Sequence, residues 1–179
     1  MYTSSKQEIF DQLSSNNSDF IRTNTDSVIK LCVSKLIGDE ISLCDIVEGL
    51  KHFLTNTSPT ERAFGVQLLV DVLQNLSTTK VNDKELTYLS AFFVDRLKDH
   101  HSVVPHVIVG IIALVKQKNI TSEDVKSLLC TLFQEVPCQA QILADRRNIY
   151  SLLKYCIVNK TKDVKEMNDE FILNFISAA

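Results

Sequence analysis

Signals that start α-helices return at a nearly constant interval along this chain. One series of helix starts advances in steps of roughly 40 residues, at Ser42, Asp83, Ser122 and Asp163. A second series falls between them in steps of roughly 43 residues, at Pro59, Ser102 and Asp145. The spacing predicts a repeated pair of helices, in which each pair buries its apolar side chains against the next pair.

A helix pair every 40 to 47 residues is the period of HEAT and armadillo arrays. We therefore predict an all-α protein, a HEAT/armadillo-like α-solenoid of antiparallel helix pairs. Gly and Pro number only 4 and 3 in 179 residues, which leaves too few turn formers for a many-stranded sandwich or barrel. A compact helical bundle is the alternative, but a bundle gives no reason for a constant repeat length.

The repeats divide the chain into two parts. Residues 1–40 have weaker helix signals and are predicted to form a helical N-terminal cap, regular or irregular. Residues 41–179 are predicted to form about three and a half repeats, with bounds 41–78, 82–118, 121–160 and 163–179. The last of these begins with Asp163 and is expected to be half a repeat.

Capping residues mark the expected helix starts. Ser58-Pro59-Thr60-Glu61 has the form of a capping box with Pro at the first helical position. Asn82 precedes Glu85 by three residues, and Thr121-Ser122-Glu123-Asp124 has a similar arrangement. Asp145 is expected to cap the helix that follows it.

The most apolar segment, Val103–Val115, is interrupted by Pro105, His106 and Gly110 and is too short to span a bilayer. It is expected to be a buried helix, and no membrane association is predicted. The N-terminus lacks a basic start followed by an apolar stretch, so we expect no secretory signal and an intracellular protein.

Charge and cysteine usage indicate neither a nucleic-acid protein nor a metalloprotein. The formal net charge is −3, and the basic cluster from Arg146 to Lys165 is interrupted by Asp163 and followed closely by Glu166, Asp169 and Glu170, so direct nucleic-acid binding is not expected. The five cysteines include no Cys-x-x-Cys pair and are expected to be reduced and mostly packed, with no metal or cofactor.

A histidine cluster raises the alternative of catalysis. His100, His101 and His106 lie near Asp95 and Asp99, a set that suits a metal or a general base. However, the adjacent His100 and His101 are expected to point apart at a helix end, with a structural role there. There is no phosphate-binding Gly-rich loop, nucleophile elbow or His-Glu-x-x-His motif. We therefore predict that the chain is not an enzyme.

Partner contacts in a solenoid are usually made by one helix of each pair, on the concave surface. Rotating away from the apolar faces of the second-series helices at 100° per residue gives the candidate positions. They are Gln67, Asp71, Gln74, His106, Gln117, Arg147, Ser151 and Lys154. The alternative is that these are ordinary solvent-facing residues.

Three stretches in these repeats resemble one known family. The most specific stretch is Phe92–Pro105. Two further stretches support it: Phe133–Ala140 with Asp145–Tyr150, and Ser58–Leu69. The stretches occur in the order and spacing of that family. They resemble the N-terminal region of the large HEAT-repeat adaptor of the cytosolic iron–sulfur protein assembly targeting complex. That family is named for methyl methanesulfonate sensitivity and is linked to nucleotide excision repair and transcription.

The resemblance implies a non-catalytic protein-interaction adaptor that helps deliver iron–sulfur clusters to apoproteins of DNA repair, replication and transcription. The implied partners are cytosolic iron–sulfur assembly subunits and apoproteins such as repair helicases and polymerases, in the cytoplasm and the nucleus. Family members are much longer, so the chain corresponds to an N-terminal fragment or a short product. The alternative is a HEAT-type structural or transport scaffold, cytoskeletal or for nuclear import.

Overall fold

The computed structural model describes residues 2–14, 17–78 and 80–160. The predicted helix that begins at Asp163 lies outside these residues. The described part consists of α-helices joined by short connections, with one 3₁₀ turn. These are α1 (Tyr2–Gln12), α2 (Ser18–Thr23), α3 (Thr25–Ile37), α4 (Leu43–Gly49), α5 (Lys51–Leu54), α6 (Pro59–Gln74), α7 (Asp83–Arg96), α8 (Val104–Val115), α9 (Ser122–Glu135), η2 (Cys138–Ala140) and α10 (Leu143–Asn159).

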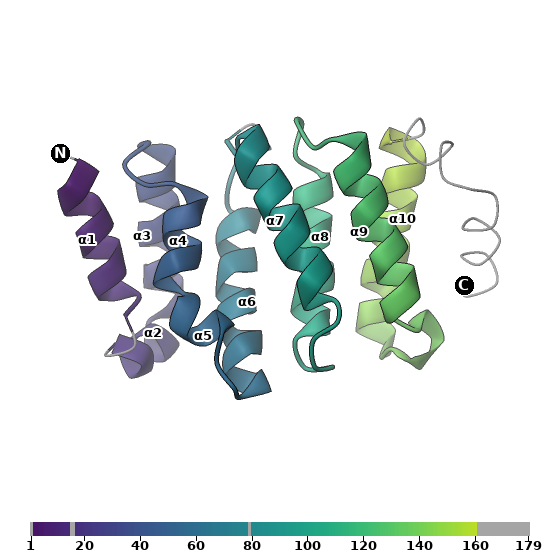
Figure 1. The fold of residues 1–179 in the computed structure, drawn as a ribbon, viewed down its shortest axis with the longest axis horizontal. Coiled ribbons are helices and arrows are strands. Elements are labelled where there is room, and N and C mark those ends of the chain that lie inside the picture. Colours follow the sequence, from purple (N-terminus) through teal and green to yellow (C-terminus); the bar gives the residue numbers. More distant parts are fainter. Residues whose placement is uncertain (1, 15–16, 79, 161–179) are drawn as a thin grey trace.

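The helices form a stack of two layers that runs from one end of the molecule to the other (Figure 1). Layer A contains α1, α4, α7 and α9, and layer B contains α3, α6, α8 and α10. Within layer B, α6 packs between α3 and α8, and α8 packs between α6 and α10. In layer A, α1 packs on α4 and α7 packs on α9, while α7 also contacts α8 across the layers. The predicted all-α solenoid is thus confirmed.

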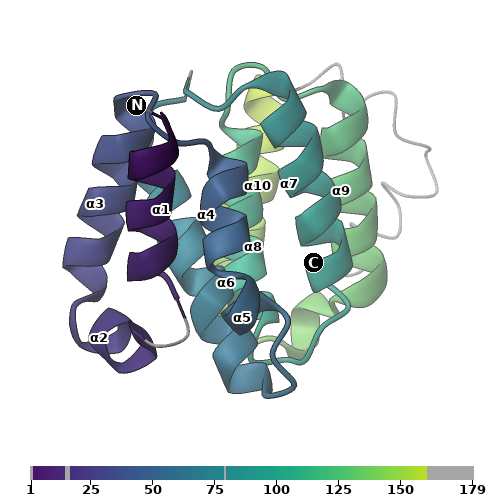
Figure 2. The ribbon, with the colours of Figure 1, turned by 60° about the vertical axis from the view of Figure 1, so that its left-hand side comes forward.

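The first three helices continue the two layers toward the N-terminus. Figure 2 shows α1 and α3 side by side ahead of α4 and α6, with the short α2 joining them at one end. Ile9 and Leu13 are fully buried against the stack, as is Ile21 of α2. The assignment of residues 1–40 as a cap stays a prediction, as do the repeat bounds. The helices that those bounds group are α4 to α6, α7 with α8, and α9 with α10.

Two of the predicted caps are present in layer A. Asn82 accepts a hydrogen bond from the Glu85 backbone N–H, and the Glu85 carboxylate bonds back to the Asn82 N–H, which completes a capping box. The Thr121 hydroxyl accepts from the Asp124 N–H. Ser42 and Asp45 form a further complete box at the start of α4. Each box satisfies backbone donors that a helix start leaves unpaired.

Two predicted caps in layer B are wrong. Ser58 does occupy the N-cap position, followed by Pro59, but its side chain makes no cap bond, and the Glu61 carboxylate binds Arg22 of α2 at 2.5 Å instead of reaching back. Asp145 is not the cap of α10: Ile142 precedes the helix, and Asp145 lies buried in its first turn. Layer B helices therefore begin without the side-chain caps of layer A.

Glycine allows the two layers to approach closely at matching points. A Cβ atom at Gly65 of α6 would lie 2.6 Å from the Cβ of Phe53, and one at Gly110 of α8 would lie 2.6 Å from Cζ of Phe93. Both phenylalanines are fully buried and come from the neighbouring helix of the same repeat. The aromatic-on-glycine contact thus recurs in successive repeats, and any side chain at these glycines would force the layers apart.

The long apolar segment is a core element, as expected. Helix α8 is buried along most of its length, with Val107, Ile108, Ile111 and Leu114 inaccessible to solvent. In the described residues, no helix combines the length and the apolar character needed to cross a membrane.

Candidate protein-interaction face

Seven of the eight predicted partner contacts lie on the solvent side of layer B. On α6, Gln67 and Gln74 are exposed and Asp71 is half-buried. His106 of α8 is half-buried too, and α10 exposes its three predicted contacts, Arg147, Ser151 and Lys154. Since α6, α8 and α10 pack side by side, one layer carries all seven. Their role as partner contacts stays a prediction.

The expectation that Gln117 faces solvent is wrong. The side chain is only 3% exposed, and its Oε1 has no hydrogen-bond partner in the described part of the chain. The helical projection fails because α8 ends at Val115, so Gln117 lies in the turn beyond the helix and no longer follows its 100° period. A hydrogen bond from the Lys118 N–H to the Thr78 carbonyl, 2.9 Å long, fixes this turn against the preceding repeat.

Two apolar side chains lie between the polar positions. Val109 and Ile112 of α8 are partly buried and pack on the core while keeping a solvent-facing side. Sequence reasoning did not include them because the 3.6-residue periodicity is hard to read in a helix that is apolar all round. We call these nine residues the open face of layer B: Gln67, Asp71, Gln74, His106, Val109, Ile112, Arg147, Ser151 and Lys154.

Carboxylates and one histidine control the electrostatics of this face. Partial burial raises the pKa of Asp71, and the negative charge of Asp26 on α3 raises it further, while His106 opposes the shift. Burial lowers the pKa of His106, against the attraction of Asp71 and Asp145. A row of interacting groups thus crosses α3, α6, α8 and α10. The sequence does not show that Asp26 and Asp145 belong to this row, because the contacts arise only from stacking.

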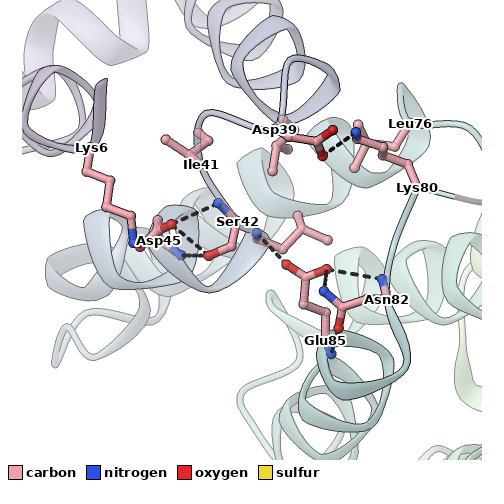
Figure 3. A pocket seen from close by; sticks show the side chains of 11 residues that line it. Lys6, Asp39, Ile41, Ser42, Asp45, Leu76, Lys80, Asn82 and Glu85 are labelled. Carbon is pink, nitrogen blue, oxygen red and sulfur yellow. Dashed lines mark hydrogen bonds and ion pairs between the residues drawn. The ribbon is translucent and has the colours of Figure 1, made fainter. Parts of the chain in front are cut away.

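A pocket of about 290 Å³ at one edge of the stack is the second place where polar groups gather (Figure 3). It lies where α4 and α7 begin. The Asp45 carboxylate forms an ion pair with Lys6 of α1, with 2.9 Å between Oδ1 and Nζ. Lys80 and Asp39 form a second ion pair, with 2.5 Å between the same atoms. The Glu85 carboxylate, 7% exposed, accepts a 2.9 Å hydrogen bond from the Leu43 backbone N–H. The charged groups that line the pocket are therefore paired within the chain.

The same contact pattern runs along layer A. In the layer A helices α4, α7 and α9, the acidic residue at the third helical position also accepts a hydrogen bond from the preceding helix of that layer. Asp45 binds Lys6 of α1, Glu85 binds the Leu43 N–H of α4, and Asp124 accepts from Thr87 of α7 at 3.5 Å. These capping carboxylates hold successive repeats together, so we assign the pocket a structural role.

The opposite edge of the stack is held by a buried ion network. Asp99, in the connection between α7 and α8, pairs with Arg62 of α6 at 2.5 Å and with Arg96 of α7 at 2.8 Å. It also accepts from the His100 N–H. These bonds outweigh burial and lower the pKa of Asp99 to about 2. Arg62 in turn donates to the carbonyls of Asn56 and Thr57, which ties two connections into one unit.

The histidine cluster does not form a site. The expectation that His100 and His101 point apart is wrong, since their rings lie 3.9 Å apart, centroid to centroid. Nδ1 of His100 lies 3.0 Å from the Ser102 hydroxyl, so this ring closes the turn before α8. His106 faces Asp71 and Asp145 instead. Among the described residues, no group of three or more His, Cys, Asp or Glu side chains is placed to hold a metal ion.

The cysteines are free and scattered over the stack. Cys32, Cys138 and Cys156 are buried, and burial raises the pKa of the Cys32 thiol to about 12. Such a thiol stays protonated and is a poor metal ligand. Cys130 is half-buried and Cys44 is exposed, so the cysteines are mostly packed, as expected, with Cys44 as the exception.

A two-layer helical stack with an open polar face and internally paired edges defines a class of protein: the HEAT-like α-solenoid, a repeat scaffold. The family model described as "Dos2-interacting transcription regulator of RNA-Pol-II", the N-terminal MMS19 model, matches residues 47–179. The chain therefore belongs to the MMS19 family, in the part that corresponds to its N-terminal region.

Curated relatives show the same similarity across eukaryotes. The MMS19 nucleotide excision repair protein of Drosophila melanogaster is 32% identical over 133 residues, which is 74% of this chain and 14% of that protein. The human homologue is 33% identical over 135 residues, 75% of this chain and 13% of its own length. The Arabidopsis thaliana homologue is 29% identical over 167 residues, 88% and 15% respectively. The chain thus spans about one seventh of these relatives.

Proposed function

We propose that this chain is a non-catalytic adaptor segment of cytosolic iron–sulfur protein assembly, which holds apoproteins of DNA repair, replication and transcription near a cluster carrier. The observation that carries the proposal is the open face of layer B, in a chain whose family is named for transcription regulation and nucleotide excision repair. Polar side chains from α6, α8 and α10 face solvent there. Solenoids bind other proteins along extended surfaces of this kind.

The chemistry of the described residues supports holding rather than turnover. The Asp99 carboxylate forms ion pairs with Arg62 and Arg96, and the Glu85 carboxylate accepts hydrogen bonds from backbone N–H groups. The thiol of Cys32 is kept protonated. In this proposal the cluster is cargo carried by other proteins, the partners are assembly subunits and apoproteins, and the chain acts in the cytoplasm and the nucleus.

Tagged co-purification of the 179-residue chain from cells, with mass spectrometry and an iron assay, tests this function. The proposal expects cluster-assembly proteins or apo repair helicases in the eluate, with an iron-free chain. Recovery of tubulin or a small GTPase instead would overturn it in favour of the cytoskeletal or nuclear-import scaffold. Iron bound to the chain itself would contradict the adaptor mechanism.

A charge-reversal pair tests the face directly. Asp71→Lys combined with Lys154→Glu leaves the net charge unchanged and alters two solvent-side positions on α6 and α10. We expect weaker capture of the recovered apoprotein with no fall in the melting temperature. Glu48→Lys combined with Lys51→Glu reverses an exposed pair on α4 and α5, away from the open face of layer B, and serves as the matched control. Unchanged capture by the layer B pair would contradict the assignment.

A further inference from the structure

The Asp71 carboxylate forms no ion pair with a cation among the described residues. It is half-buried on α6, and none of the hydrogen bonds or ion pairs in the described part of the chain involves it. Asp26 adds a second negative charge from α3, and no ion pair joins Asp26 to Lys30, one turn away. An opposite charge placed beside a half-buried carboxylate stabilises its ionised form.

A second carboxylate in the row is far more deeply buried. Asp145 is 7% exposed in the first turn of α10, and its carboxylate likewise takes part in none of the hydrogen bonds or ion pairs of the described residues. Its charge acts on His106, which lies between α6 and α10. Burial of His106 disfavours its protonated form, so this ring does not supply a full positive charge to either aspartate at neutral pH.

On this basis we propose that the open face of layer B binds an amphipathic helix of a partner protein, which places a Lys or Arg side chain between Asp71 and His106. The proposal rests on the adaptor function and names the chemistry of the partner. Val109 and Ile112, beside His106 on α8, accept the apolar side of the bound helix. Helix-in-groove recognition combines such apolar anchors with charged contacts at their border.

The distribution of charge sets the orientation of the bound helix. The carboxylates of Asp26 and Asp71 lie toward α3 and α6, while the exposed charges of the face on α10 are the cations Arg147 and Lys154, since Asp145 of that helix is buried. A bound helix with its cationic residues toward α6 and its acidic residues toward α10 therefore places opposite charges together at both ends of the face. The reverse orientation places like charges together, which costs affinity.

Fluorescence anisotropy with two synthetic peptides tests the proposal on the 179-residue chain. One is an amphipathic helix of Leu and Lys, and the other has Glu in place of every Lys. We expect the Lys peptide to bind, more weakly as salt rises, and the Glu peptide to bind at least tenfold more weakly. Asp71→Asn keeps the size of the side chain and is expected to weaken the Lys peptide roughly five- to tenfold.

A matched control separates a local contact from bulk charge. Glu123→Gln removes one exposed negative charge from α9 in layer A and should leave the affinity unchanged. Equal losses from Asp71→Asn and Glu123→Gln, or tighter binding of the Glu peptide, would overturn the proposal. So would tighter binding of a single-stranded DNA oligonucleotide than of the Lys peptide.

Failure of this inference is distinguishable from failure of the adaptor function. If the apoprotein is captured but Asp71→Asn has no effect on it or on the Lys peptide, the adaptor function stands and the assigned face is wrong. If the Lys peptide depends on Asp71 but no iron–sulfur apoprotein is recovered from cells, the face stands and the adaptor function is wrong.

Discussion

Two half-buried aspartates, Asp99 and Asp71, meet opposite surroundings in the same stack. Asp99 lies at a loop edge between Arg62 and Arg96, and these pairings lower its pKa to about 2. Asp71 lies on the open face of layer B, where burial and Asp26 raise its pKa. The first carboxylate is satisfied within the chain, and the second is not.

The difference separates residues that hold the repeats together from residues available to a partner. At both edges of the stack, charged groups bridge successive helices, through Asp99 at one edge and through Glu85 at the other. On the open face, the Asp71 carboxylate remains unpaired among the described residues, although only α8 separates its helix, α6, from the cations of α10. Substitutions at the edges should therefore change stability, and substitutions on the face should change binding.

The largest expected effect is the loss of the ion network. Asp99→Ala leaves Arg62 and Arg96 partly buried without their shared carboxylate, which should lower the free energy of unfolding by about 3 kcal/mol. Urea denaturation measures the change. Asp95→Ala removes a largely exposed carboxylate paired with the same Arg96, and this control should cost less than about 1 kcal/mol. Equal costs for the two variants would contradict the network.

Acid should remove the same contribution in the natural chain. Because the pKa of Asp99 is lowered to about 2 in the folded state, below its ordinary value of 3.8, its contribution is complete above pH 3.8. It is lost as the pH falls from there toward 2. Urea denaturation should show the gap between the natural chain and Asp99→Asn narrowing over this interval. A gap that stays constant between pH 6 and pH 3 would contradict the assignment.

A smaller loss is expected at the other edge. Glu85→Gln keeps the shape of the side chain but replaces a charged acceptor of the Leu43 and Asn82 N–H groups with a neutral one, which should cost about 1 kcal/mol. Glu48→Gln, on the exposed side of α4, is the control and should stay within about 0.5 kcal/mol. Thermal unfolding of both variants tests whether the layer A carboxylates join repeats.

The smallest effect, and the only one with the opposite sign, belongs to Asp71. Since its pKa is raised in the folded state, the ionised form opposes folding at neutral pH, and the penalty disappears below the unfolded pKa. Asp71→Asn should therefore be slightly more stable than the natural chain at pH 7, by less than about 1 kcal/mol. This gain should vanish near pH 3. A clear destabilisation at pH 7 would place Asp71 among the structural residues.

The sequence predicts local features of this fold better than contacts between repeats. The caps at Asn82 and Thr121 follow from residues three positions apart, so the chain itself contains all the information needed. The helix period likewise identifies the solvent side of α6 and α10, where Gln67, Arg147 and Lys154 are exposed as expected.

Two of the wrong predictions, at Ser58 and at Gln117, share one physical cause. Glu61 leaves the expected box at Ser58 because Arg22, 39 positions earlier, lies beside it in the stack. Gln117 turns inward because Lys118 bonds to Thr78 of the previous repeat. Arg62, one of the two cations that bind Asp99, is 37 positions from it, and the charged neighbours of Asp71 are also far from it in sequence. Only the stacking of the repeats brings these groups together, and a single sequence does not show that register.

Hydrogen exchange with mass spectrometry, on the chain alone and bound to the apoprotein recovered by co-purification, locates the binding surface on the stack. If the open face of layer B is the binding surface, peptides from α6 and α8 that contain Asp71, His106 and Ile112 should gain protection. Peptides from α7 and α9 should not change. Protection confined to α7 and α9, with layer B unaffected, would contradict the account.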